Sequence, residues 1–402
     1  MRKLVISILS VLLALFICMP AFAEHTVEQV RAQYEAISST DILYDPEGFI
    51  SDAAAQSMLG HARFMRWLAY VEEPLEITDE FSELAQAGAQ LLAAADTPAH
   101  ELPQPEGFPD ALYEIASAGI RGSNIACINW MDTDVLVAAL EYFQRDEGAH
   151  NRFTLGHRRW LLSPALQHTG FVLANAESGM TYVTMYVHDF TAETVHRWDH
   201  IAWPSAGAFP AEYMYDQTPW SVILSDKVYA SEHPQLNITV SCEQTGERFA
   251  INRFAQEDAP DAYWIDTDGY GLGYALIFRP ASISEFEQNQ VWRVRIENLQ
   301  KLDGSLAAIE YEVHMMALEP IPVRLIELSD TEVHLKAGDS HALSANVVPH
   351  WADDVSICWR SSDESVATVD CDGLVTAVSS GKCTITADGA DGQSASCTIT
   401  VE

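Results

Sequence analysis

Among the side chains that could do chemistry, one histidine stands in the most distinctive setting. His157 follows Gly156 and precedes Arg158 and Arg159, inside the largely apolar stretch Leu155–Pro164. An imidazole changes charge near neutral pH and can bind a metal, accept a proton or hold a ligand. The chain carries 58 acidic residues, so we expect the two arginines to be structural and to pair with nearby acids.

The common catalytic motifs are missing from the sequence. It contains no Gly-x-Ser-x-Gly nucleophile elbow and no His-Glu-x-x-His zinc motif. Cys127 follows two apolar residues, so we expect it to pack in the core and not to act as a nucleophile. The glycine-rich segment Gly269–Gly273 does not lead into a helix, which argues against a phosphate loop. No complete set of catalytic residues emerges, and binding is favoured over turnover.

The elements that must position His157 follow from the spacing of apolar residues. Helices are predicted after a capping box at Thr26, over 52–71, after a cap at Thr78, and over about 133–145. From Gly170 onward the helical period gives way to alternation, and 180–187 is predicted as a strand. The first half of the chain is therefore expected to combine helices with a sheet.

The residues around His157 resemble a known family. The run Gly156–Pro164, followed by Thr169-Gly170-Phe171, is similar to the second-histidine signature of the CAP superfamily (cysteine-rich secretory proteins, antigen 5, pathogenesis-related 1). The bacterial, SCP-like branch matches best, and the resemblance covers roughly 52–215. It implies a three-layered α-β-α sandwich.

The resemblance also implies a set of site residues in one cleft. The family places a histidine after its first long helix, which corresponds to His100. Its Gly-Glu-Asn-Ile-Ala motif corresponds to Gly122–Ala126, with Ser123 in place of the glutamate and Asn124 retained. A second acid is expected at Asp146, or at Glu147 because the register is open.

Two imidazoles and one or two carboxylates could bind zinc. The same groups could instead form a hydrogen-bonded polar cluster without a reaction. Ser123 removes one candidate carboxylate, and a catalytic zinc usually has three protein ligands. The alternative to a binding module is therefore an extracellular metal-dependent hydrolase that uses the same cleft. Its zinc would be held by His100 and His157.

Charge and the first residues predict an exported protein. The formal net charge is -36 over 402 residues, which would repel nucleic acid and other polyanions. Basic Arg2 and Lys3, an apolar run over 4–18 and Ala21-Phe22-Ala23 have the form of a signal peptide over 1–23. A lipid attached at Cys18 is disfavoured because Ile17 is bulky. With no second apolar run of spanning length, we expect secretion or loose wall association and no transmembrane segment.

The rest of the chain, from residue 218 onward, is predicted to be β-structure. Short alternating segments fill 218–320, and the proline-rich stretch Glu319–Pro322 then forms a linker. The pattern from Val323 to Glu402 resembles a bacterial Ig-like group 2 domain. Six cysteines remain outside the leader, so disulfides are conceivable in an exported chain.

The predicted fold class is thus α+β and multidomain. A CAP-type α-β-α sandwich over 24–217 precedes two all-β Ig-like sandwich domains, at 218–320 and 321–402. The predicted function is an extracellular binding or adhesion module whose cleft takes a small ligand, a peptide, or a cell-wall or host-surface component.

Overall fold

The computed structural model describes residues 24–37, 51–129, 135–146, 148, 151–192, 195–215, 218–253, 261–280, 283 and 286–402. The predicted signal peptide and Glu147 lie outside these residues. Within them, no helix is long and apolar enough to cross a membrane.

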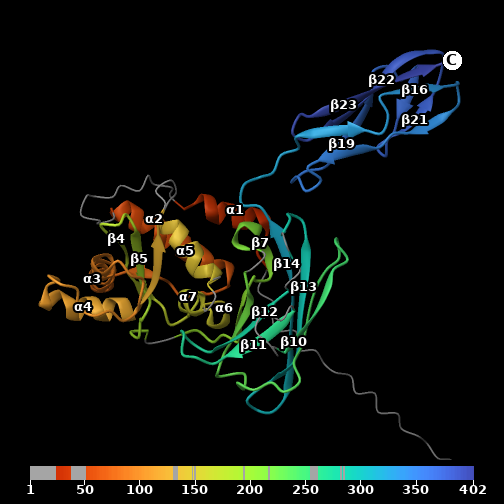
Figure 1. Cartoon of the computed structure of the whole chain (residues 1–402). Coiled ribbons are helices and arrows are strands. Elements are labelled where there is room, and N and C mark those ends of the chain that lie inside the picture. Colours follow the sequence, from red (N-terminus) through yellow and green to blue (C-terminus); the bar gives the residue numbers. More distant parts are fainter. Residues whose placement is uncertain are drawn as a thin grey trace, which may run out of the picture.

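A three-stranded antiparallel sheet forms the middle layer of the first part of the chain. Its order is β2 (Ser123–Ile128), β5 (Thr181–Tyr186) and β4 (Phe171–Asn175). Helices α3 (Asp79–Ala95) and α4 (Asp110–Arg121) cover one face, and α2 (Asp52–Leu68) and α5 (Val135–Arg145) cover the other (Figure 1). Strand β5 is buried on both faces. The arrangement is a mixed α+β structure with helices on both sides of a sheet.

Local sequence explains where these helices begin and how closely they pack. The predicted capping box at Thr26 is present and opens α1 (Val27–Glu35). Thr78 accepts a hydrogen bond from the Phe81 N–H (3.3 Å) at the start of α3. Helices α3 and α4 cross where Gly119 lies against the Leu84 carbonyl, and a Cβ there would be only 2.1 Å from that oxygen. The helix predictions near Thr26, over 52–71 and from Thr78 are confirmed.

A nine-stranded sheet follows and curls round on itself. In sheet order the strands are β6 (His200–Trp203), β8 (Trp220–Leu224), β12 (Tyr274–Arg279), β11 (Ala262–Asp266), β10 (Arg248–Arg253), β9 (Asn237–Cys242), β13 (Val291–Gln300), β14 (Leu306–Met316) and β7 (Gly207–Pro210). The two edge strands, β6 and β7, are joined by residues 204–206 alone. The four Cα–Cα steps from Trp203 to Gly207 reach at most about 14 Å, so the two edges must lie near each other. Trp220 and Trp292 meet edge-to-face inside the curl, with ring centroids 6.4 Å apart.

This sheet corrects the boundary predicted after residue 217. Strands β6 and β7 precede that position, yet they pair with β8 and β14, which follow it. One continuous apolar core also joins residues of α2 and α5 to residues of β8, β13 and β14. The alternating period identified the strands of 218–320 but not the strands with which they pair. Because β6 and β7 are among those strands, 218–320 does not form a separate domain.

Shorter elements connect these layers. Strand β1 (Glu76–Ile77) pairs with β3 (His168–Thr169), and a 3-10 turn, η1, covers Ala211–Tyr213. Helices α6 (Asn151–Thr154) and α7 (Gly156–Leu161) lie between α5 and β3. The predicted His157 therefore lies on a short helix between the helical layers and the curled sheet.

The last part of the chain is a β-sandwich with its own core, in agreement with the prediction for 321–402. Its strands are β15 (Leu325–Leu328), β16 (Glu332–Leu335), β17 (Ser340–Ala342), β18 (Ala345–Val348), β19 (Ile357–Ser361), β20 (Ala367–Val369), β21 (Leu374–Ala377), β22 (Gly381–Gly389) and β23 (Ser394–Val401). It stands apart from the other strands and helices in Figure 1. Asp353 accepts hydrogen bonds from Arg31 and Gln288 (both 2.8 Å), which ties the domain's base to the rest of the chain.

The cysteines of the described residues are free thiols. Cys127 is half-buried beside Tyr182, as expected for a packing role. Cys383 and Cys397 lie buried in the core of the last domain and are not bonded to each other. Disulfide bonds therefore do not stabilise the described residues of the protein.

Candidate functional site

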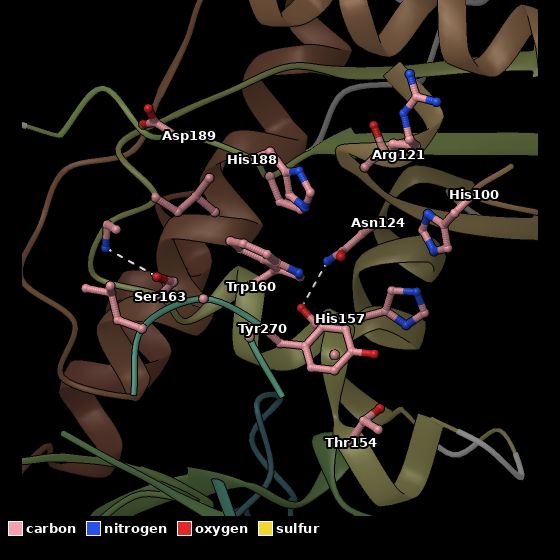
Figure 2. A pocket seen from close by; sticks show the side chains of 18 of the residues that line it. His100, Arg121, Asn124, Thr154, His157, Trp160, Ser163, His188, Asp189 and Tyr270 are labelled. Atoms are coloured by element: carbon pink, nitrogen blue, oxygen red, sulfur yellow. Dashed lines mark hydrogen bonds between the residues drawn. The ribbon is translucent and has the colours of Figure 1, made fainter. Parts of the chain in front are cut away.

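One cavity of about 650 Å³ brings together the residues singled out from the sequence. Its walls come from the loop after α3, from β2, from α6 and α7, from the segment after β5, and from the loop between β11 and β12. Figure 2 shows three imidazoles in these walls, those of His100, His157 and His188. The volume is in the range of pockets that bind small molecules.

His157 is held by a buried carboxylate. Asp146, which is 0 % exposed, follows α5 with a positive φ of 51°. One oxygen accepts from Nδ1 of His157 (2.7 Å), and the other accepts from the Arg158 N–H (3.0 Å). Because a carboxylate only accepts, Nδ1 carries the proton in the neutral ring and Nε2 keeps its lone pair. No hydrogen bond joins that Nε2 to another described residue.

His100 has a matching arrangement. Its Nδ1 lies 2.8 Å from the carbonyl oxygen of Ile120 at the end of α4. A carbonyl also only accepts, so Nδ1 carries the proton here and Nε2 is the acceptor. In Figure 2 the rings of His100 and His157 lie toward each other on one side of the cavity. These two rings therefore offer their Nε2 lone pairs to the cavity.

Strand β2 supplies two further residues predicted for the site. The Asn124 amide donates to the carbonyl oxygen of His157 (3.0 Å), which fixes the start of α7 against the sheet (Figure 2). Ser123 is 3 % exposed and lines the cavity. Its hydroxyl makes no hydrogen bond to the described residues, so a buried polar group is left for a ligand or a water molecule to satisfy.

The structure brings most, but not all, of the predicted residues to the cavity. His100, Ser123, Asn124 and His157 line it. Asp146 does not, because it lies behind His157 and acts through that ring. Glu147 lies outside the described residues.

The two arginines after His157 connect the helical layers to the curled sheet. Arg159 pairs with Asp266 of β11, as expected for an arginine in an acid-rich chain. Arg158 donates to the main-chain carbonyls of Gln144 (2.5 Å) and Pro219 (2.7 Å). Both side chains are buried, so they position α7 and its histidine and do not face a ligand.

Sequence reasoning missed the wall formed by 269–272. The sequence argues against a phosphate loop here but gives this glycine-rich loop no other role. In the structure it lines the cavity. The Tyr270 ring lies against Gly156, where a Cβ would come within 2.9 Å of it. Gly271 has a φ of +68°, and a Cβ there would be 2.8 Å from the Arg159 carbonyl oxygen. The glycines on both sides of Tyr270 were the sequence signal that could have predicted this close approach of the loop to the backbone of α7.

His188 and Trp160 also belong to the cavity. His188 follows β5, and its ring centroid lies 4.6 Å from that of Trp160. Burial lowers the pKa of His188, and the nearby His100 lowers it further. The neutral form of this imidazole is therefore favoured near pH 7.

The donor set does not fit a zinc ion held by three protein ligands. Among the residues that the structure describes, no group of three or more histidine, cysteine or acidic side chains is placed to hold a metal. Both oxygens of Asp146 already accept hydrogen bonds. Of the ligands predicted from the sequence, the Nε2 atoms of His100 and His157 remain, and no third donor among the described residues is placed with them.

One family model matches the chain. It is the bacterial Ig-like domain (group 2), over residues 322–399, and it confirms the resemblance noted for the last part of the sequence. The matched segment is one β-sandwich of the described structure.

Curated relatives match short parts of the chain. A lacto-N-biosidase of Bifidobacterium bifidum is 49% identical over 67 residues, which are 17% of this chain and 6% of that protein. A 3-O-alpha-D-galactosyl-alpha-L-arabinofuranosidase of Bifidobacterium longum is 46% identical over 59 residues, 15% of this chain and 5% of that protein. The chain thus spans only a small fraction of these relatives' length.

Solved structures match parts of the chain at low identity and low TM-score. An intimin mutant of EHEC O157:H7 is 22% identical and covers 19% of this chain and 46% of its own, with a TM-score of 0.17. Domains 4 and 5 of the S-layer protein SbsC are 14% identical and cover 40% of this chain and 98% of their own, with a TM-score of 0.20.

Proposed function

We propose that this protein is an extracellular bacterial binding protein. Its α-β-α part would be a CAP-type domain that holds a small ligand, a peptide or a cell-surface component in the cavity of His100 and His157. The Ig-like domain would act as a spacer or adhesive unit. The observation that carries the proposal is the pair of imidazoles that face one cavity with their Nδ1 atoms already engaged.

Binding agrees with the chemistry of this cavity better than turnover does. Both Nε2 atoms are acceptors, the Ser123 hydroxyl is unpaired among the described residues, and Asp146 fixes one ring from behind. These groups can orient a ligand that donates hydrogen bonds. A hydrolase would also need a nucleophile close to a base and donors for the developing negative charge, and no contact of the described residues joins His157 to a nucleophile.

An extracellular location is proposed from three observations. The first residues have the form of a signal peptide, the last domain matches a bacterial Ig-like family, and the net charge of -36 suits a soluble exported protein. N-terminal sequencing of protein recovered from the culture medium tests this location. A chain that begins at Glu24 agrees with it, whereas a lipid-modified Cys18 contradicts release.

The binding role is tested with arrays of oligosaccharides and hexapeptides probed with labelled protein. We expect the unsubstituted protein to bind at least one probe and His157→Ala to bind it about tenfold less, because one hydrogen bond to a partly buried imidazole is lost. His334→Ala is the matched control, since His334 is exposed on β16 and far along the chain from the cavity. An unchanged binding pattern in His157→Ala would contradict the proposal.

The second candidate is a metal-dependent hydrolase in the same cavity. Its support is the Asp146–His157 pair, which has the form of a base and its orienting group. A divalent ion such as zinc would be held by His100 and His157 and would polarise a carbonyl or a water, but their two nitrogens are too few for the usual site. Metal analysis of protein purified without chelator, together with a peptide cleavage assay, decides between the candidates. Cleavage that disappears in His157→Ala would replace the binding role with the hydrolase.

A further inference from the structure

Aromatic rings form a continuous row along one wall of the cavity. The ring centroids of Trp160 and His188 are 4.6 Å apart, and those of His188 and Phe190 are 5.7 Å apart. Phe190 is 80 % exposed although it is a large apolar side chain. All three residues line the cavity, and the row ends at the exposed ring of Phe190. An exposed ring at the end of such a row is typical of a surface that stacks against a ligand.

Tyr270 adds a fourth ring from a different part of the chain. It comes from the loop between β11 and β12, and Figure 2 shows it beside His157. Arg159 lies under this ring, with its guanidinium 5.3 Å from the ring centroid. The ring is therefore supported on one side and can offer the other to a ligand.

The polar groups of the cavity match a ligand with many hydroxyl groups. The two histidine Nε2 atoms accept hydrogen bonds, the buried Ser123 hydroxyl can do both, and Arg121 at the edge can donate. A ligand must therefore bring donors and acceptors close together on a small frame.

Recognition of a cationic ligand has little support among the described residues of the cavity walls. Asp189 is the carboxylate that lines the cavity, and it is already engaged. One of its oxygens accepts from the N–H groups of Gln167 and His168, and the other accepts from Thr191. A cationic ligand would find no free carboxylate there, and a polyanion would be repelled by the net charge of -36.

We propose that the cavity binds a carbohydrate, with sugar rings stacked on Trp160, Phe190 and Tyr270 and hydroxyl groups bonded to Ser123 and the two histidines. A pyranose has an apolar C–H face for an aromatic ring and hydroxyl groups at its edge that both donate and accept. A peptide backbone brings only one donor and one acceptor per residue, spaced along an extended chain. The inference rests on the proposed binding function and names the class of ligand.

Isothermal titration of the full mature chain with cellohexaose, chitohexaose and mannohexaose tests the proposal. We expect at least one sugar to bind, and Phe190→Ala and Tyr270→Ala each to weaken it by about threefold to tenfold, the loss expected for one stacked ring. Leu302→Ala is the control, because Leu302 is 61 % exposed and does not line the cavity. Circular dichroism of each variant checks that the fold is retained.

The outcomes separate this inference from the proposed function. Sugar binding that is equally strong in both aromatic variants, or no binding of any of the three sugars, overturns the carbohydrate inference. A phenylalanine-containing hexapeptide is titrated in parallel. If it binds and His157→Ala weakens it, the binding function survives while the carbohydrate assignment fails. If neither sugars nor peptide bind, both fail.

Discussion

The replacement of Asp146 by asparagine should reverse the hydrogen-bonding character of the cavity. Asparagine tolerates the positive φ of 51° at this position, so the backbone can stay in place. The amide keeps one acceptor oxygen and gains a donor. The Arg158 N–H needs the acceptor, and the new N–H2 group then faces His157. The ring must accept at Nδ1, so its proton moves to Nε2 and the cavity loses a lone pair.

The size of the effect follows from the contacts that change. A ligand that donated to Nε2 of His157 would meet a donor instead, and an unsatisfied buried pair costs about 1–3 kcal/mol. That free energy corresponds to roughly five- to 150-fold in affinity. The lost charge-assisted hydrogen bonds of the buried Asp146 should also lower the free energy of unfolding by about 1.5–3 kcal/mol.

Two measurements check this prediction. Nitrogen NMR of labelled imidazoles at pH 7.5 reports which ring nitrogen carries the proton, and urea denaturation reports the stability. His100 is the internal control, because its Nδ1 bonds the Ile120 carbonyl and should be unaffected by the substitution. If His157 in Asp146→Asn still carried its proton on Nδ1, or already carried it on Nε2 before substitution, the reasoning would be wrong.

Three further predictions concern other parts of the structure. Gly271→Ala should destabilise the protein by about 1–3 kcal/mol, because it forces a side chain into a left-handed conformation against backbone; Gly269→Ala, in open space, should change the urea midpoint little. His233 accepts from a backbone N–H, and burial lowers its pKa. As the pH falls, the unfolded chain therefore binds a proton at His233 before the folded chain does. The stability contributed by the neutral His233 ring is present above pH ~6.5 and is lost as the pH falls below it. His233→Gln should flatten this part of the pH dependence of stability in calorimetric scans. Asp353→Ala should widen the range of orientations of the last domain, seen as a larger radius of gyration in X-ray scattering, whereas Asp354→Ala, which loses only a local turn contact, should not.

Local features were predictable because they depend on neighbours in the sequence. The caps at Thr26 and Thr78 follow from short-range hydrogen bonds. Asp146 was expected beside His157 from the family resemblance, and only 11 positions separate the two. The resemblance also led to His100, which the sequence spacing alone would not have singled out.

Long-range features were not predictable in the same way. Tyr270 meets Gly156 only because the loop between β11 and β12 folds back onto α7. Nothing in the residues of strands β6 and β7 shows that they pair with β8 and β14. A period of two identifies a strand and its buried face, but it leaves the partner strand open.

The buried arginines explain why the cavity and the curled sheet form one unit. Arg158 needs the carbonyl of Pro219, and Arg159 needs Asp266 and the carbonyl of Asp268, all beyond the boundary expected after residue 217. Removal of such partners leaves a buried guanidinium uncompensated, which costs about 3–5 kcal/mol for a broken buried ion pair. The histidine that faces the cavity is the residue just before these arginines, so its position depends on the sheet. The same sheet supplies the loop of Tyr270, which completes the cavity wall beside His157 (Figure 2). A ligand in this cavity would therefore contact both parts of the chain, and its affinity would depend on contacts that neither part makes alone.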